Sequence, residues 1–154
     1  MHKTARDRIR RIFVSRQSHF SQITAADLLG MSFAKLRREM ADGTILTIST
    51  GVGMRVPKEE MIAAAMRTWD QAAIETALGD DAPTVLPDAI RLVLLRARIP
   101  RYQRDMLVAL AERYRTTVDE VLARELEDVA CARAEDLAAK VPTLSQALAW
   151  PSQP

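Results

Sequence analysis

The chain has 154 residues, of which 48% are apolar and 5% aromatic, so it is long enough for one or two small domains with hydrophobic cores. It contains no run of about eighteen apolar residues, which excludes a transmembrane helix. The single cysteine, Cys131, excludes an internal disulfide and suits a reducing compartment such as the cytoplasm. The net charge of +2 conceals a division, because residues 1–58 carry 11 Lys/Arg and 4 Asp/Glu, whereas residues 59–154 carry 11 and 16. This division predicts a basic nucleic-acid face at the front and an acidic interaction domain at the rear.

The first predicted element is a helix within residues 1–17. Ile9, Ile12 and Phe13 have the spacing of a buried helical stripe. The same segment is rich in cations, and we expect its arginines to contact DNA phosphates: Lys3, Arg6, Arg8, Arg10, Arg11 and Arg16. A solubilising surface or a targeting peptide is the alternative, although an aspartate at position 7 and the lack of a long apolar run disfavour a signal sequence.

Residues 24–43 have the pattern of two short helices joined by a tight turn. Thr24 is predicted to begin the first helix, and Gly30 allows the left-handed turn that ends it. Ser32 is predicted to cap the second helix, over residues 33–41, and Gly43 to end it.

The second of these helices is predicted to have an apolar face and a cationic face. Phe33, Leu36 and Met40 share one side at helical spacing and should be buried. Three cations lie outside that stripe and should remain in solvent: Lys35, Arg37 and Arg38. A short helix with this size and charge fits the DNA major groove. The alternative is an ordinary helical hairpin with a solvated basic face.

A β-hairpin is predicted directly after these helices. Residues 45–50 alternate as in a strand, residues 51–53 contain the glycines of a turn, and residues 54–56 form a short return strand. Pro57 would then open the next helix. A hairpin in this position is a wing, and it would bring Arg55 to the DNA backbone or minor groove.

Residues 20–62 together resemble the excisionase/MerR-like winged helix-turn-helix module. The resemblance rests on four motifs: Ile23-Thr-Ala-Ala-Asp-Leu-Leu-Gly-Met-Ser, Leu36-Arg-Arg, Asp42-Gly-Thr-Ile and Met54-Arg-Val-Pro-Lys-Glu-Glu-Met61. The acidic-Ala-Ala order of the family is permuted here, and the wing tip lacks the usual Arg or Lys. The resemblance implies that residues 32–38 read DNA and residues 50–55 form the wing. Its implied DNA contacts, with the basic residues Arg10 and Arg11 added, are Thr24, Ser32, Lys35, Arg37, Arg38, Arg55 and Lys58.

The middle of the chain is predicted to be one helix over residues 58–78, followed by a linker at residues 79–86. The DNA-binding domain would then be residues 1–78, and the second domain residues 87–154. Trp69 is expected in the core or an interface, with stacking on a ligand as the alternative. No metal cluster, nucleophile–base pair or phosphate-binding glycine loop occurs, so we expect no enzyme, metal or cofactor.

The second domain is predicted to contain a strand and two helices. Residues 90–99 are a short apolar run in which Arg96 and Arg98 alternate with Ala97 and Ile99. A proline at position 100 should open a helix to about residue 114, and Thr117 should cap the next one. The predicted buried residues of the two helices are Met106, Leu107, Leu110, Ala111, Val118, Val121, Leu122, Leu126 and Val129. The tail is predicted to add a short helix around residues 145–150.

This order of elements resembles the ribbon-helix-helix fold, in which two chains pair their strands into one antiparallel ribbon. The resemblance implies that Arg96 and Arg98 read bases and that Thr116 or Thr117 holds a phosphate. Arg115 stands where the family usually has glycine. A domain that only dimerises and a plain helical hairpin are the alternatives. The implied dimerisation residues are Leu95, Ala97, Ile99, Leu107, Leu110, Val121 and Leu122.

The sequence therefore predicts a mainly α fold with a small β-wing: a winged helix-turn-helix followed by a C-terminal strand-helix-helix dimerisation domain. We expect a homodimer that binds double-stranded DNA sequence-specifically, as a transcriptional regulator or an excision factor of the same fold, away from the membrane. The alternative is an antitoxin-type repressor whose acidic C-terminal domain binds a protein partner.

Overall fold

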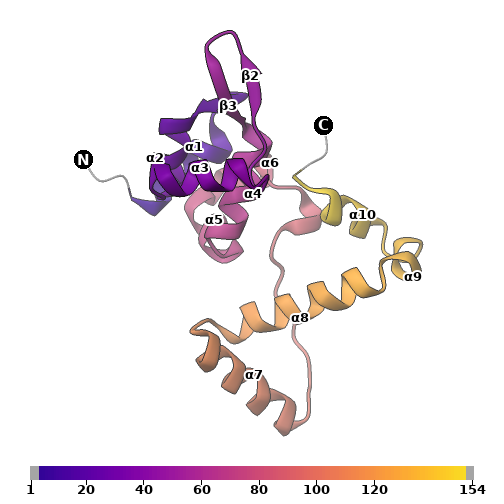
Figure 1. The fold of residues 1–154 in the computed structure, drawn as a ribbon. Coiled ribbons are helices and arrows are strands. Elements are labelled where there is room, and N and C mark those ends of the chain that lie inside the picture. The colour runs from indigo at the N-terminus through magenta and orange to yellow at the C-terminus, as the bar shows by residue number, and fades with distance from the viewer. Residues whose placement is uncertain (1–3, 152–154) are drawn as a thin grey trace. The chain divides into compact units, whose positions relative to one another are not determined.

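The structure is a computed structural model, and it describes residues 4–151; Lys3 lies outside this range. The chain divides into two compact units: unit 1 runs to Leu92 and includes the C-terminal residues from Ala149, and unit 2 is Val93–Leu148. Helices dominate, and the small antiparallel sheet belongs to unit 1 (Figure 1). The predicted class, mainly α with a small β element, is confirmed. In the described part of the chain, no helix is long and apolar enough to cross a membrane.

Unit 1 begins with helix α1 (Ala5–Val14), which has a reciprocal cap. The Thr4 hydroxyl accepts a hydrogen bond from the Asp7 N–H at 3.2 Å, and the Asp7 carboxylate accepts from the Thr4 hydroxyl at 2.6 Å and the Thr4 N–H at 3.3 Å. The two bonds that the carboxylate accepts hold the pKa of Asp7 below its ordinary value. Ile9, Ile12 and Phe13 are buried, as the spacing predicted.

Helix α2 (Gln22–Leu29) begins two residues earlier than predicted. Its cap is Ser21, whose Oγ accepts from the Thr24 N–H at 3.1 Å, so the prediction that Thr24 begins the helix is wrong. Gly30 ends the helix at φ 67°, which confirms the predicted left-handed turn.

Helix α3 (Phe33–Ala41) has the predicted bounds and the predicted cap, Ser32. Leu36 is fully buried and Met40 is half-buried against the core. Phe33 is 44% exposed, so its predicted burial is wrong. Because helical side chains tilt toward the N-terminus, that of the first residue projects beyond the end of the helix.

The sheet has three strands in the order β1-β3-β2: β1 (His19–Ser21), β2 (Ile48–Thr50) and β3 (Gly53–Pro57). The predicted hairpin is β2–β3, but its first strand is shorter than expected. Ile45 donates its N–H to the Glu39 carbonyl at 3.0 Å, and Leu46 donates to the Glu60 carboxylate at 3.0 Å. These bonds hold the start of the β-branched run beside α3 and α4, so it cannot join the ladder.

The unpredicted strand β1 gives the sheet two distinct faces. Phe20 pairs with Val56, and both are buried on one face. Ser21 and Ile48 both pair with Arg55, so these three side chains share the opposite face. Arg55 therefore lies on the central strand, with hydrogen-bonded neighbours on both sides.

The predicted helix over residues 58–78 is two helices, α4 (Lys58–Thr68) and α5 (Gln71–Leu78). Trp69 is extended, and the Asp70 carboxylate accepts from the Ala73 N–H at 2.6 Å, which caps α5. The continuous helix was the wrong prediction because this cap is stronger than the apolar periodicity across it. Trp69 packs half-buried against the core, and both helices pack on α1.

The predicted linker at residues 79–86 is folded into unit 1. It forms a 3₁₀ turn, Gly79–Asp81, and the short helix α6 (Ala82–Val85), and a second 3₁₀ turn follows at Asp88–Ile90. Ala82 and Leu86 are buried in the same core as α1. The boundary between the units therefore lies near residue 92.

Unit 2 contains α7 (Arg101–Tyr114), α8 (Val118–Ala132), α9 (Ala134–Ala138) and α10 (Pro142–Ala149), whose last residue is assigned to unit 1. The first two match the predicted helices and form a helical hairpin. Arg115 ends α7 in the left-handed conformation at φ 54°, and Thr117 caps α8.

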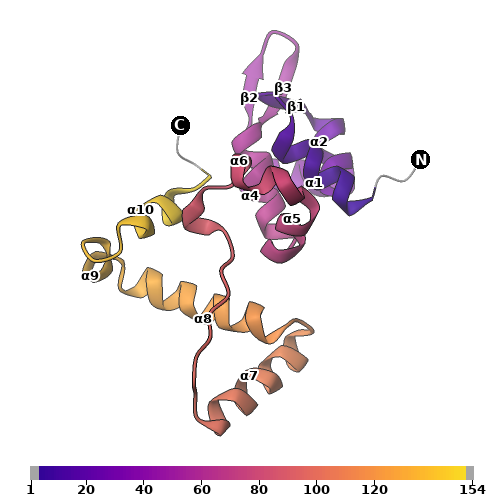
Figure 2. The same cartoon turned by 180° about the vertical axis from the view of Figure 1, so that it is seen from behind.

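The predicted strand at residues 90–99 is absent from the described single chain. Residues 92–100 are an exposed connection without helix or strand that leads into α7 (Figure 2). Of the helical residues predicted to be buried, Met106, Leu126 and Val129 are 50–52% exposed, so that prediction is wrong for one chain alone. The α7–α8 hairpin is two helices thick, and no further layer of unit 2 covers these three side chains.

Candidate nucleic-acid interface

The exposed side of α3 carries the cations that the sequence predicted. Lys35, Arg37 and Arg38 are all exposed, and Lys35 Nζ lies 3.6 Å from Glu39 Oε1 with its own side chain 61% exposed. The side chains of Arg37 and Arg38 form no hydrogen bond or ion pair with the residues that the structure describes, although the charge of Arg38 contributes to the lowered pKa of Asp42. Two guanidinium forks on one short helix can each donate two parallel hydrogen bonds to a guanine edge or a phosphate.

The end of α3 is fixed by a turn that leads to the hairpin. Asp42 is the C-cap residue of α3, and its carboxylate accepts a hydrogen bond from the Thr44 N–H at 3.0 Å. Hydrogen bonds from the Thr44 hydroxyl and N–H lower the pKa of Asp42, which keeps it an acceptor in neutral solution. Together with the bond from the Ile45 N–H to the Glu39 carbonyl, this turn fixes where β2 starts relative to α3.

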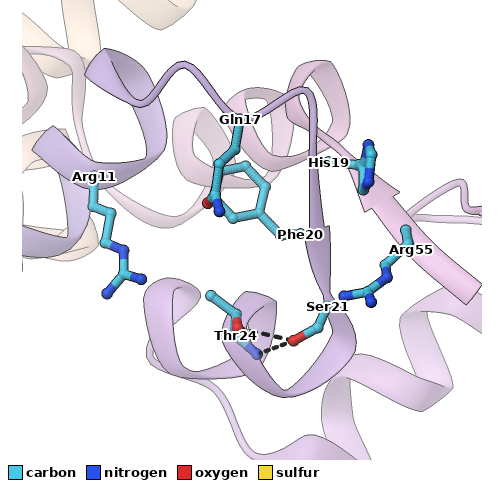
Figure 3. A pocket seen from close by; sticks show the side chains of 7 residues that line it. All are labelled: Arg11, Gln17, His19, Phe20, Ser21, Thr24 and Arg55. Atoms are coloured by element: carbon cyan, nitrogen blue, oxygen red, sulfur yellow. Dashed lines mark hydrogen bonds between the residues drawn. The ribbon is translucent and has the colours of Figure 1, made fainter. Parts of the chain in front are cut away.

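A pocket of about 240 Å³ lies at the first turn of α2, and Figure 3 shows it from close by. Its walls come from α1, the segment after α1, β1, α2 and β3. Six of the seven lining residues are polar, and none is acidic: Arg11, Gln17, His19, Phe20, Ser21, Thr24 and Arg55. In this pocket the structure brings together three residues that the sequence analysis had named separately, Arg11, Thr24 and Arg55.

The arginines reach this pocket from two different elements. Arg11 is exposed on α1, and Arg55 is half-buried on the central strand. Figure 3 shows their guanidinium groups on opposite sides of the Ser21–Thr24 turn. The Nε atom of Arg55 is buried and has no hydrogen-bond partner in the structure. Because Nε is shielded, an acceptor that enters the pocket would be bound by the terminal nitrogens of this guanidinium group.

Two of the other predicted DNA contacts have partners inside the protein. Arg10 donates to the Leu78 carbonyl at 2.8 Å and to the Asp81 carboxylate at 2.5 Å, which connects α1 to the end of α5. Lys58 Nζ donates to the Ser15 carbonyl at 2.6 Å. The structure thus gives both side chains a role in holding unit 1 together.

The contacts predicted in unit 2 divide into an exposed group and a packed group. Arg96 and Arg98 lie in the exposed connection with Leu95, Ala97 and Ile99. Thr116 is half-buried, and the Thr117 hydroxyl caps α8 by accepting from the Glu120 N–H at 3.2 Å. The remaining predicted dimerisation residues pack within the α7–α8 hairpin, buried or half-buried: Leu107, Leu110, Val121 and Leu122.

The acidic surplus of the chain is not in unit 2. Residues 93–148 carry nine Lys/Arg and nine Asp/Glu, so this unit is neutral. The surplus lies in residues 59–92, with seven Asp/Glu and two Arg, and these residues belong to unit 1. The prediction of an acidic C-terminal domain is therefore wrong. The charges were counted from residue 59, and residues 59–92 belong to unit 1.

The sequence analysis did not name four of the pocket residues: Gln17, His19, Phe20 and Ser21. Their position depends on β1, which has only three residues and no periodicity that a sequence pattern can detect. Among residues 4–151, no group of three or more His, Cys, Asp or Glu could hold a metal ion. No family model, curated protein or solved structure matches this chain.

Proposed function

We propose that this protein is a dimeric, sequence-specific binder of double-stranded DNA that acts as a transcriptional regulator or as an excision factor of the same fold. The observation that carries the proposal is the series α2, Gly30 turn, α3 and β2–β3 hairpin. The side chains of the two arginines of α3 are exposed and form no ion pair among the described residues. This order supports an excisionase/MerR-like winged helix-turn-helix.

In this proposal α3 lies in the major groove. Arg37 and Arg38 donate to base edges or phosphates, and Lys35 acts as a weaker point charge because Glu39 is near it. The hairpin β2–β3 projects from the other elements of unit 1 (Figure 1) and lies along the DNA backbone as the wing. Ser32 holds the first turn of α3 in place through its cap.

Unit 2 would hold two copies together. The connection before α7 exposes four successive apolar residues by 49–85%: Leu92, Val93, Leu94 and Leu95. Pairing of this segment with that of a second chain would cover these side chains and the half-exposed Met106, Leu126 and Val129. A dimer of this kind would read two half-sites about one helical turn apart.

The second candidate is an antitoxin-type repressor in which the same apolar segment binds an unrelated protein. The exposure of residues 92–95 favours it as well. Since unit 2 is neutral, such a partner would be recognised by apolar contacts and not by a basic surface. Sedimentation velocity of the purified full chain separates the candidates: a dimer supports the first, and a monomer at micromolar concentration supports the second.

The DNA-binding proposal is tested by fluorescence anisotropy of random duplex DNA with the full chain over a salt series. Arg37→Ala and Arg38→Ala should each weaken binding by about 1–3 kcal/mol if they contact guanine, and log affinity should fall steeply with log salt. Arg113→Ala, which removes an exposed arginine from α7, is the matched control and should leave the affinity unchanged. Equal affinities in all four proteins would contradict the role of α3.

A further inference from the structure

We propose that the pocket at the first turn of α2 is an oxyanion site that binds one phosphate group of the DNA backbone, with Arg11 and Arg55 on either side of it. This inference rests on the proposed DNA binding and specifies a contact outside α3. Part of it follows from residues that the sequence analysis did not connect with DNA, Gln17 and His19.

The composition of the pocket favours an anion over other ligands. Two arginines line it, and no carboxylate does. The single apolar lining residue, Phe20, has its ring on the buried face of the sheet. Nothing else in the walls would attract an apolar or a cationic group, whereas Gln17, Ser21 and Thr24 add neutral hydrogen-bonding groups.

The start of α2 adds backbone donors of the correct polarity. The first N–H groups of a helix have no partner within the helix, and the N-terminus carries a partial positive charge. Ser21 Oγ accepts from the Thr24 N–H, and this hydroxyl also bonds to the Thr24 hydroxyl at 2.8 Å. N–H groups at a helix N-terminus that have no partner within the helix can donate to a phosphate oxygen.

Arg55 is held in position before any ligand arrives. Its backbone is in the central strand, paired with Ser21 on one side and Ile48 on the other. Its side chain is half-buried, and its buried Nε lacks a partner. Binding therefore costs little side-chain entropy.

A phosphate bound in this pocket would position the protein on the duplex. Contacts to the backbone fix register and orientation, and base contacts supply specificity. Because α2 and α3 are joined by the short Gly30–Ser32 turn, a phosphate held at the start of α2 restricts how deeply α3 enters the groove.

The test is a double-mutant cycle on the full chain with random duplex DNA, using Arg11→Gln, Arg55→Gln and the double variant. Each single variant should weaken binding by about tenfold, with a smaller effect of the second substitution in the presence of the first. The magnitude of the slope of log affinity against log salt should fall by about 0.9 in the double variant, because one phosphate contact is lost. Arg113→Gln removes an exposed arginine from α7, outside the pocket, and is the matched control.

Additive effects equal to that of Arg113→Gln would overturn the proposal, since they would indicate unrelated surface charges. Arg55→Lys retains the charge and should recover part of the affinity, and thermal unfolding by circular dichroism verifies that each variant is folded. Loss of binding in Arg37→Ala with unchanged binding in the pocket variants would leave the proposed function standing and remove this site.

If the wild-type chain binds no duplex DNA, the proposed function fails and the pocket is tested with inorganic phosphate at constant ionic strength. Shifts of the Gln22–Thr24 backbone amides in the NMR spectrum of the wild type, but not of the double variant, would retain the oxyanion site. The absence of such shifts would overturn it.

Discussion

Unit 1 and unit 2 are both built mainly from helices, yet they differ greatly in what they bury. Among the described residues, nineteen apolar side chains from α1 to Leu86 form one continuous core in unit 1. In unit 2 the buried residues are Leu107, Ala111 and Val121. An apolar stripe stabilises a helix only where another element covers it. In unit 2, α7 and α8 cover mainly each other, whereas the helices of unit 1 pack against several elements.

The difference also separates the two kinds of function that we propose. A unit with its own core can hold α3 and the pocket rigidly, as recognition of DNA requires. A unit with exposed apolar residues is suited to association, and its stability should depend on the concentration of its partner. The following predictions test that contrast.

The largest effect is expected from truncation in the core of unit 1. Phe13 is 1% exposed on α1, so Phe13→Ala should lower the free energy of unfolding of this unit by about 3–5 kcal/mol. Urea unfolding followed by circular dichroism measures it. A loss below 1 kcal/mol would mean that unit 1 is as loosely packed as unit 2.

The next effect concerns association through unit 2. Leu95 is 65% exposed, and Leu95→Glu should weaken dimerisation by about 2–3 kcal/mol, since burial of a leucine contributes roughly that much. Sedimentation equilibrium measures the dissociation constant. In calorimetry, a rise in protein concentration should raise the melting temperature of unit 2 and leave that of unit 1 unchanged, and two concentration-independent transitions would contradict the dimer.

A smaller effect is expected at the turn between α2 and α3. Gly30 has φ 67°, and an added Cβ would lie 2.7 Å from an Arg8 side-chain nitrogen. The flexible arginine can move, so the cost of Gly30→Ala comes mainly from the left-handed backbone and should be about 1–2 kcal/mol. Urea unfolding of the variant measures this value. Gly43→Ala is the control for the backbone cost alone, because Gly43 also has a positive φ and no atom lies within 4 Å of an added Cβ.

Arg10 and Arg11 are neighbours in sequence for which we predict opposite effects. Arg10→Gln should lower stability by about 0.5–1 kcal/mol, because the ion pair with Asp81 is partly exposed, and it should not change DNA affinity. Arg11→Gln should change DNA affinity and not stability. Equal loss of DNA affinity in both variants would restore Arg10 as a DNA contact.

The smallest effect is a pH dependence at the start of α1. Since the folded-state pKa of Asp7 is below its ordinary value of 3.8, its contribution is complete above that value and is lost as the pH falls through the folded-state pKa. The difference in unfolding free energy between wild type and Asp7→Ala should therefore disappear in acid. Urea titrations from about pH 6 to about pH 2 measure it, and a difference that does not change with pH would contradict the role of the carboxylate.

Local signals in the sequence were sufficient wherever a cap or a turn residue acts within a few positions. Gly30 ends α2, Ser32 begins α3 and Thr117 begins α8, as predicted. The predicted helix bounds were wrong where a nearby residue that caps a helix was overlooked. Ser21 replaced Thr24 as the cap of α2, and Asp70 divided the helix predicted over residues 58–78.

The sequence by itself determined α1, α3, α7 and α8, the exposed cations of α3 and the hairpin that follows, because helix caps, side-chain periodicity and glycine turns are short-range properties. Only the tertiary structure decided which arginines are available. Arg10 meets a carbonyl and a carboxylate sixty-eight and seventy-one residues away, whereas Arg11 meets Arg55 and the first turn of α2 across a shared pocket. Which of two adjacent guanidinium groups finds a partner depends on elements far along the chain, and no local pattern contains that information.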